Sequence, residues 1–184
     1  MKPSTVFLLI SLFSTVTLNA QDNQTKTDSV KVITDFKNLF SYQNFYLGGH
    51  QTLEELQWLK SQGVNKIINL RSERENKEYS EFAYNEESNA KALGFEYFSV
   101  PVDGLKDYTP EKLDELIKHI NANEKVLIHC ASGGRATDFF MAYLIKSKGY
   151  SINEAIEIGR QLKFSLPLEK LLDTKISMET LTTE

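Results

Sequence analysis

The sequence predicts a single α/β domain whose central sheet is largely parallel and flanked by helices. Apolar runs with the spacing of strands alternate along the chain with runs that have apolar residues at helical spacing. One of these runs, Val126-Leu127-Ile128, is wholly apolar, which is typical of a central strand covered on both faces. The chain of 184 residues is long enough for one core and too short for two comfortable ones. A sheet of this kind carries its functional site at the carboxyl ends of its strands.

The first half of the domain is expected to begin and end with a strand. Thr52 and Glu55 form a capping box at the start of a helix, and Gly63 stands where a helix usually ends. The apolar residues that follow Gly63 are too continuous for a half-exposed strand. The expected elements are, in order, a strand at 45–47, a helix at 52–63, a strand at 64–71, a polar helix at 80–93 and a strand at 95–102.

The second half shows equally clear helix starts. Thr109 can cap a helix that has Pro110 in its first turn. Ser151 and Glu154 form a second capping box. The expected elements are a helix opening at 109–110, the central strand at 126–128, a helix at about 135–147 and a helix from 151 through 162.

The N-terminal residues have the three-part layout of a secretory signal. Lys2 gives a positive start, an apolar run follows at 6–13, and Ala20 supplies the small residue before the cleavage point. The apolar run is too short to span a bilayer, although a retained N-terminal anchor is the alternative. We therefore expect an exported protein, periplasmic or secreted, without stable membrane insertion after cleavage. Its expected parts are a signal peptide at 1–20, a disordered mature N-terminus at 21–29, a domain at 30–172 and a frayed tail at 173–184.

Charge and composition argue against several functional classes. The net charge of −4 is unfavourable for a nucleic-acid partner, because phosphate backbones require a basic face. The histidines at 50, 119 and 129 lack metal-ligand spacing, and no dinucleotide-binding or nucleotide-binding motif occurs, so we expect no metal and no cofactor. The chain has one cysteine, Cys130, which cannot form an internal disulfide in an exported protein. Such a residue is either an inert buried side chain or a functional thiol.

The surroundings of Cys130 favour a functional thiol. The loop that follows it leaves the most buried strand and enters a helix, so its backbone N–H groups can converge on a tetrahedral anion. Gly133 and Gly134 allow the backbone to turn tightly, and Arg135 can hold two phosphate oxygens through its planar fork. The positive end of a helix and a nearby guanidinium favour the thiolate form of a cysteine. We expect Cys130 to be the nucleophile and Arg135 to be the second catalytic group.

Four segments carry a family resemblance: Asn44-Phe45-Tyr46-Leu47-Gly48-Gly49, Ile67-Ile68-Asn69-Leu70-Arg71, Val100-Pro101-Val102-Asp103 and His129-Cys130-Ala131-Ser132-Gly133. With them, the chain from about Val30 to Leu171 resembles the beta-lactamase-hydrolase-like subfamily of the protein tyrosine and dual-specificity phosphatases. The resemblance implies a dual-specificity-phosphatase-like fold, a phosphocysteine intermediate, no metal and a phosphorylated substrate. It also implies that the loop residues Ala131, Ser132, Gly133, Gly134 and Arg135 bind phosphate and that His129 orients this loop.

Two departures from the family pattern leave other functions open. Only four residues separate Cys130 from Arg135, whereas the main phosphatase families have five and rhodaneses have four. The alternatives are therefore a rhodanese-like sulfurtransferase that uses a Cys130 persulfide, and a module that binds a phosphorylated ligand without turnover. Ala136 also stands where the phosphatases usually carry a hydroxyl that helps to release phosphate, and Thr137 is one residue further on.

The leaving group of a phosphate ester needs a proton from an acid on a separate loop. Asp103 follows a strand that we expect beside the strand of Cys130, and the resemblance places the acid in that loop. Asp107 is the alternative donor, and Asp103-Gly104 is also a strong turn signal. Arg71 is expected to support the catalytic loop or to bind substrate or, as the preferred interpretation, to form a surface pair with Glu73 or Glu75.

Overall fold

The structure is a computed structural model that describes residues 28–82, 85–121, 123–162 and 168–176. The expected signal peptide, most of the mature N-terminus and most of the C-terminal tail lie outside these residues. The strands are β1 (Lys31–Val32), β2 (Leu39–Tyr42), β3 (Phe45–Gly48), β4 (Val64–Asn69), β5 (Glu96–Ser99) and β6 (Lys125–His129). The helices are α1 (Leu53–Ser61), α2 (Glu73–Phe82), α3 (Glu86–Ala92), the 3₁₀ helix η1 (Gly104–Asp107), α4 (Pro110–Ile117), α5 (Gly134–Lys148), α6 (Ile152–Arg160) and α7 (Leu168–Leu172).

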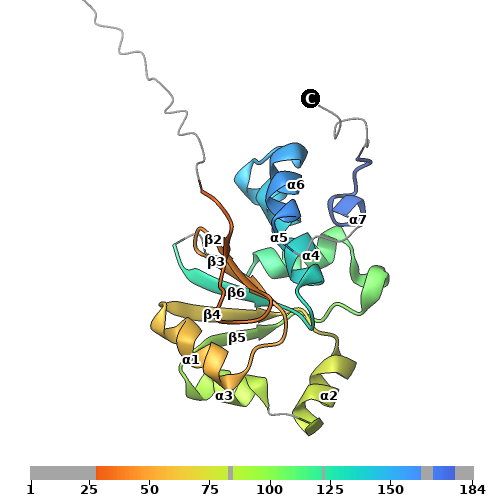
Figure 1. Cartoon of the computed structure of the whole chain (residues 1–184). Coiled ribbons are helices and arrows are strands. Elements are labelled where there is room, and N and C mark those ends of the chain that lie inside the picture. The colour runs from red at the N-terminus through yellow and green to blue at the C-terminus, as the bar shows by residue number, and fades with distance from the viewer. Residues whose placement is uncertain (1–27, 83–84, 122, 163–167, 177–184) are drawn as a thin grey trace, which may run out of the picture.

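The strands form one mixed sheet in the order β1-β2-β3-β6-β4-β5. The pairs among β3, β6, β4 and β5 are parallel, and β1 and β2 add an antiparallel edge. β6 is central, with β3 and β4 on either side (Figure 1). The predicted α/β domain with a largely parallel sheet flanked by helices is confirmed, and Cys130 directly follows the central strand.

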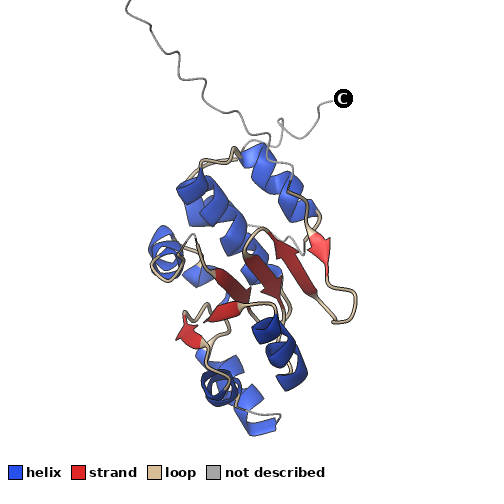
Figure 2. Ribbon diagram, turned by 90° about the vertical axis from the view of Figure 1, so that its left-hand side faces the viewer, coloured by secondary structure: helices blue, strands red, loops and turns tan. Residues whose placement is uncertain are grey.

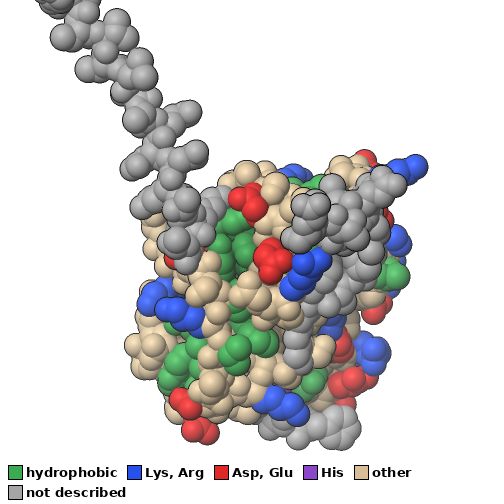
Figure 3. All heavy atoms as spheres, turned by 45° about the horizontal axis from the view of Figure 1, so that its top comes forward, with side chains coloured by type: hydrophobic (Ala, Val, Ile, Leu, Met, Phe, Trp, Pro, Cys, Tyr) green, Lys and Arg blue, Asp and Glu red, His purple; other side chains and the backbone are tan. Residues whose placement is uncertain are grey.

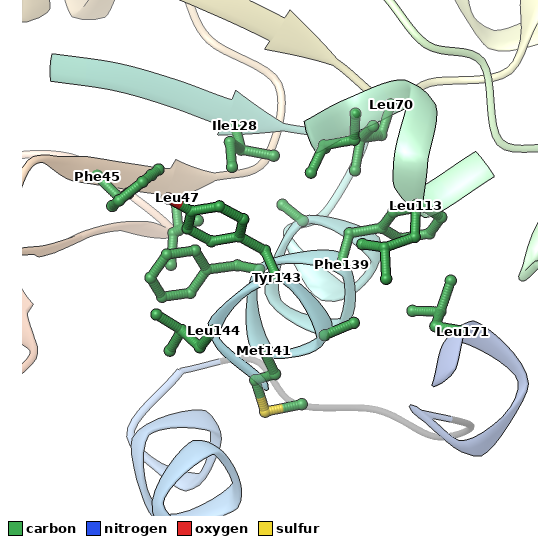
Figure 4. Close-up of a cluster of buried hydrophobic side chains, with 14 of the residues drawn as sticks. Phe45, Leu47, Leu70, Leu113, Ile128, Phe139, Met141, Tyr143, Leu144 and Leu171 are labelled. Carbon is green, nitrogen blue, oxygen red and sulfur yellow. The ribbon is translucent and has the colours of Figure 1, made fainter. Parts of the chain in front are cut away.

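Helices cover both faces of the sheet (Figures 1 and 2). The larger core lies between the sheet and the helices α4 to α7, where Tyr143 of α5 points toward Phe45 of the sheet and Phe139 lies beside Leu113 of α4 (Figure 4). A smaller core lies under α1 and α3 and contains Leu56, and Leu127 of β6 reaches it from the sheet. Because both faces of β6 are covered, its backbone is held rigidly at the point where the loop after Cys130 begins.

The helix starts follow the sequence signals. Thr52 with Glu55 and Ser151 with Glu154 form complete capping boxes, and the Thr109 side chain caps α4 ahead of Pro110. The polar helix expected at 80–93 is instead two helices, α2 and α3. The strand expected at 95–102 is shorter, and the edge strands β1 and β2 are elements that the sequence analysis does not predict.

Acidic and basic side chains are interspersed on the face drawn in Figure 3, with apolar side chains between them. Among the residues that the structure describes, no helix has both the length and the apolar character needed to cross a membrane.

Candidate active site

Cys130 begins a tight loop between β6 and α5. Its side chain is fully buried, and the backbone N–H of Gly133 donates a hydrogen bond of 3.1 Å to its Sγ. Gly133 has a φ of 103°, which a residue with a Cβ rarely adopts, and α5 starts at the next residue. The sulfur therefore receives a backbone donor at the start of a helix, the position that stabilises negative charge.

The strand next to the loop fixes its outer side. The backbone N–H of His50 donates to the carbonyl of Ala131 at 3.0 Å, and the N–H of Cys130 donates to the carbonyl of Gly48 at 3.2 Å. At Gly49 an added Cβ would lie 3.0 Å from the Ala131 carbonyl oxygen, so the two backbones approach more closely than another residue type allows. The segment 48–50 thus acts as a rigid support for the loop.

Arg135 is anchored from three other segments of the chain. Its Nη1 and Nη2 lie 2.7 Å from the two carboxylate oxygens of Glu75, and Nη1 also donates to the backbone carbonyls of Leu70 and Val102 at 3.2 and 2.8 Å. Burial lowers the pKa of Arg135, but the Glu75 hydrogen bonds and the nearby Cys130 side chain outweigh it and raise the pKa. A guanidinium has five N–H donors, and these bonds use Nη1 and one side of Nη2. The Nε–H and the second Nη2–H can still take two oxygens of a phosphate.

Glu75 stays ionised over a wide pH range. Burial raises the pKa of its carboxyl, but hydrogen bonds from Arg135 and Ser72 lower it further, to about 2. A carboxyl whose pKa is depressed on folding stabilises the fold at higher pH, and this contribution is lost as the pH falls from its ordinary value of 4.5 through about 2. The Arg135–Glu75 pair therefore remains intact under neutral and mildly acidic conditions.

We predict that Glu75→Gln lowers kcat/KM for a phosphate ester about 10- to 100-fold, because Arg135 loses the bidentate partner that aims it. Steady-state kinetics with an aryl phosphate measures the loss. Glu78→Gln is the matched control, since Glu78 lies on the same helix and forms an exposed pair with Arg74. Equal kinetics for the two variants would show that Glu75 does not position Arg135.

A buried polar cluster lies behind the loop. His129 Nε2 is 2.8 Å from Glu86 Oε1, and Arg71 Nη2 is 3.2 Å from Glu86 Oε2. Burial raises the pKa of Glu86, but the charges and hydrogen bonds of His129, His50 and Arg71 hold that pKa well below its usual range. The preferred prediction of a surface pair for Arg71 is wrong: its side chain is buried, and its carboxylate partner is Glu86 because Glu75 is held by Arg135.

The structure places Asp103 in an exposed loop before η1. The expectation that the strand before Asp103 lies beside the strand of Cys130 is wrong, because β4 lies between β5 and β6. The loop still reaches the site, since the carbonyl of the preceding residue, Val102, accepts a hydrogen bond from Arg135. The Asp103 carboxylate is 2.6 Å from Lys106 Nζ, and this hydrogen bond lowers its pKa. Asp107 Oδ2 accepts a hydrogen bond of 2.7 Å from the Asp103 N–H.

The remaining site residues have distinct surroundings. Ser132 is exposed on the loop, and Gly134 is the first residue of α5. The Thr137 hydroxyl donates to the Gly133 carbonyl at 3.1 Å, so this bond occupies its proton instead of a bond to the Cys130 sulfur. Among the described residues, no group of three or more His, Cys, Asp or Glu side chains could hold a metal ion.

Comparison with known proteins identifies the family. The family model for the dual specificity phosphatase catalytic domain matches residues 45–171, which include every loop residue described above. The chain belongs to the dual-specificity phosphatase family. Protein-tyrosine-phosphatase IBR5 of Arabidopsis thaliana is 30% identical over 121 residues, a match that spans 63% of this chain and 40% of that protein.

Solved structures share the fold of this dual-specificity phosphatase family member. PTPMT1, crystallised in complex with PI(5)P, superposes with a TM-score of 0.58 at 20% identity, covering 70% of this chain and 86% of that chain. A DUF442 protein of Shewanella putrefaciens CN-32 gives a TM-score of 0.57 at 19% identity, covering 76% and 91%.

Sequence reasoning misses two residues of this candidate site. It considers Glu75 only as a surface partner of Arg71, and it does not single out Glu86. Both lie in the first turn of short polar helices, where a glutamate usually interacts with the positive end of the helix dipole and indicates no further role. The sequence carries one signal that could have drawn attention to Glu86. Asn85 is a helix-capping residue, which indicates that a separate helix begins at Glu86.

Proposed function

We propose that the protein hydrolyses a phosphate monoester through a phosphocysteine on Cys130. The thiolate attacks phosphorus, a P–S bond forms, and the bond between phosphorus and the ester oxygen breaks. The leaving oxygen takes a proton from an acid. Water then attacks the phosphocysteine, which releases inorganic phosphate and restores the thiolate. Arg135 and the loop N–H groups neutralise the charge on the phosphoryl oxygens during both steps.

The observation that carries this proposal is the hydrogen bond from the Gly133 N–H to Cys130 Sγ at the start of α5. A buried thiol with an apolar role needs no such donor, whereas a thiolate nucleophile does. The anchored guanidinium of Arg135 adds a charge that matches a phosphoryl group. The membership of the dual-specificity phosphatase family points to the same chemistry.

We propose Asp103 as the proton donor. Its lowered pKa, caused first by the hydrogen bond from Lys106, makes it an anion in the arrangement described above. Substrate binding must therefore displace Lys106 and bring the carboxyl next to the negatively charged phosphoryl group, which raises its proton affinity. Asp107, which is bound to the backbone of Asp103, is the alternative donor.

The finer identity and location of the protein are also proposals. The four segments that resemble the beta-lactamase-hydrolase-like subfamily support a place in that branch. The signal-like residues 1–20 support action in the periplasm or outside the cell. The relatives bear on substrate class only through their own names, one a protein-tyrosine phosphatase and one bound to PI(5)P. Phosphotyrosine and phosphoinositides are therefore the first substrates to compare.

Hydrolysis of para-nitrophenyl phosphate tests the proposal. The purified protein is assayed under reducing conditions from about pH 4 to 8, with and without vanadate, an analogue of the pentacoordinate phosphoryl group. We expect turnover that vanadate blocks. No turnover at any pH would contradict the proposal. Transfer of sulfur from thiosulfate to Cys130 would then favour the sulfurtransferase, and oxyanion binding alone would favour the non-catalytic module.

We predict that phosphocysteine hydrolysis is slow, because Ala136 lacks the hydroxyl expected there and Thr137 is bonded to the Gly133 carbonyl. Ala136→Ser should raise the steady-state kcat about tenfold and reduce the burst of para-nitrophenol, since one hydrogen bond to the charged leaving sulfur has about this effect. Rapid-mixing kinetics measures both quantities, and a serine at the exposed position of Ala92 is the control. An unchanged burst and kcat would mean that this hydroxyl does not limit release.

A further inference from the structure

Glu86 is the centre of a buried cluster that no substrate-contacting role explains. Its Oε1 accepts a hydrogen bond of 3.0 Å from the Tyr97 hydroxyl and lies 2.8 Å from His129 Nε2. Its Oε2 lies 3.2 Å from Arg71 Nη2 and 3.3 Å from His50 Nδ1. The whole residue is 4% exposed. An ionised carboxylate this deep is retained only where its partners compensate the loss of water.

His129 connects this carboxylate to the catalytic loop. Its side chain has no exposed surface, and its two ring nitrogens face oxygens on opposite sides, Glu86 Oε1 at 2.8 Å and the Cys130 carbonyl at 3.4 Å. The contact with the Glu86 carboxylate on one side fixes the direction in which the ring faces the Cys130 carbonyl on the other.

Residues of the Glu86 cluster contact two carbonyls of the loop, those of Cys130 and Ala131. His129 faces the first of them, and the backbone N–H of His50 holds the second, that of Ala131. His50 itself belongs to the Glu86 cluster. A loop whose carbonyls are held outward can turn its N–H groups inward, as that of Gly133 does toward the Cys130 sulfur.

We propose that Glu86 is a positioning residue of the phosphate-binding loop, which it aligns through His129. The catalytic importance of Glu86 rests on the proposed function, but its effect on the shape of the anion-binding loop does not. It predicts that loss of the Glu86 charge weakens the binding of any tetrahedral oxyanion, with or without turnover.

Glu86→Gln is the principal variant, and tungstate is the probe, because it is a tetrahedral oxyanion that the enzyme does not consume. Calorimetry should show tungstate affinity reduced about 10- to 100-fold, with a comparable fall in kcat for para-nitrophenyl phosphate. Glu87→Gln is the matched control, since Glu87 lies on the same helix and forms an exposed pair with Lys91. Thermal unfolding is recorded for each variant, so that affinity is compared only between folded proteins.

A double-mutant cycle with His129→Asn separates positioning from a general structural role. The asparagine Nδ2 can replace the donor to the Cys130 carbonyl but is too short to contact Glu86. In this background we expect Glu86→Gln to change tungstate affinity by less than about twofold, the limit within which independent sites behave additively. If Glu86→Gln does not fold, Tyr97→Phe removes one hydrogen bond to the same carboxylate and should weaken tungstate binding about 2- to 10-fold.

Two results would overturn the inference. The first is a folded Glu86→Gln, or in its absence a folded Tyr97→Phe, with the tungstate affinity of the wild type. The second is an effect of Glu86→Gln that is as large in the His129→Asn background as in the protein with the native histidine. A wild-type protein that binds tungstate tightly but hydrolyses nothing would count against the proposed function alone, because the affinity measurement needs no turnover.

Discussion

Replacement of Cys130 by serine is expected to reduce kcat for para-nitrophenyl phosphate by more than about 10⁴-fold, the scale of losing a covalent nucleophile. The serine hydroxyl keeps its proton in this site, so it cannot attack phosphorus at an observable rate. The substitution is small and keeps the side chain at the position that the Gly133 N–H approaches. We therefore expect the variant to fold and to bind tungstate with an affinity close to that of the wild type.

The comparison of activity with binding makes this variant informative. Loss of turnover together with retained tungstate binding would locate the defect in the chemical step. Because Cys130 is the one cysteine of the chain, no other thiol can take over its role. Turnover near the wild-type level would contradict a cysteine nucleophile and with it the proposed mechanism.

Replacement of Arg135 by lysine is expected to lower kcat/KM about 10²- to 10³-fold, the effect of losing a principal donor to the charge of the transition state. Lysine keeps the positive charge, but an ammonium lacks the planar fork that bonds Glu75 through one edge and a phosphoryl group through another. The two short bonds to Glu75 show that this geometry is built into the site. Tungstate affinity should fall as well.

Arg160→Lys is the control for this prediction, because Arg160 is exposed on α6 and pairs with Glu157. Both variants are measured for kcat and KM, and unfolding midpoints are recorded to confirm that each is folded. An Arg135→Lys enzyme with more than about one tenth of the wild-type kcat/KM would show that charge alone suffices and that the bidentate fork is not needed.

Features that depend on local signals are predicted well from the sequence. The capping residues Thr52, Thr109 and Ser151 are where the helix rules place them. The wholly apolar run at 126–128 is indeed in the central strand, and the loop after it enters a helix at Gly134. These features follow from periodicity and cap chemistry, which act over a few neighbouring residues.

The features that sequence reasoning misses depend on contacts between distant segments. Arg135 and Glu75 are 60 residues apart, and nothing local distinguishes this glutamate from its neighbours on α2. The sheet places β4 between β5 and β6, an order that adjacency in the sequence does not reveal. A surface position is the ordinary expectation for Arg71, because an arginine is rarely buried. The Glu86 carboxylate that compensates its burial lies on α3, which follows Arg71 only after the whole of α2.

Direct detection of the covalent intermediate tests the central claim most sharply. The protein is mixed with para-nitrophenyl phosphate, quenched in acid during the burst, digested, and examined by mass spectrometry. We predict one added phosphoryl group on the peptide that contains Cys130, accumulated because its hydrolysis is slow, and none in Cys130→Ser. Steady hydrolysis with the Cys130 peptide unmodified at every quench time, or with the phosphoryl group on another residue, would contradict the account.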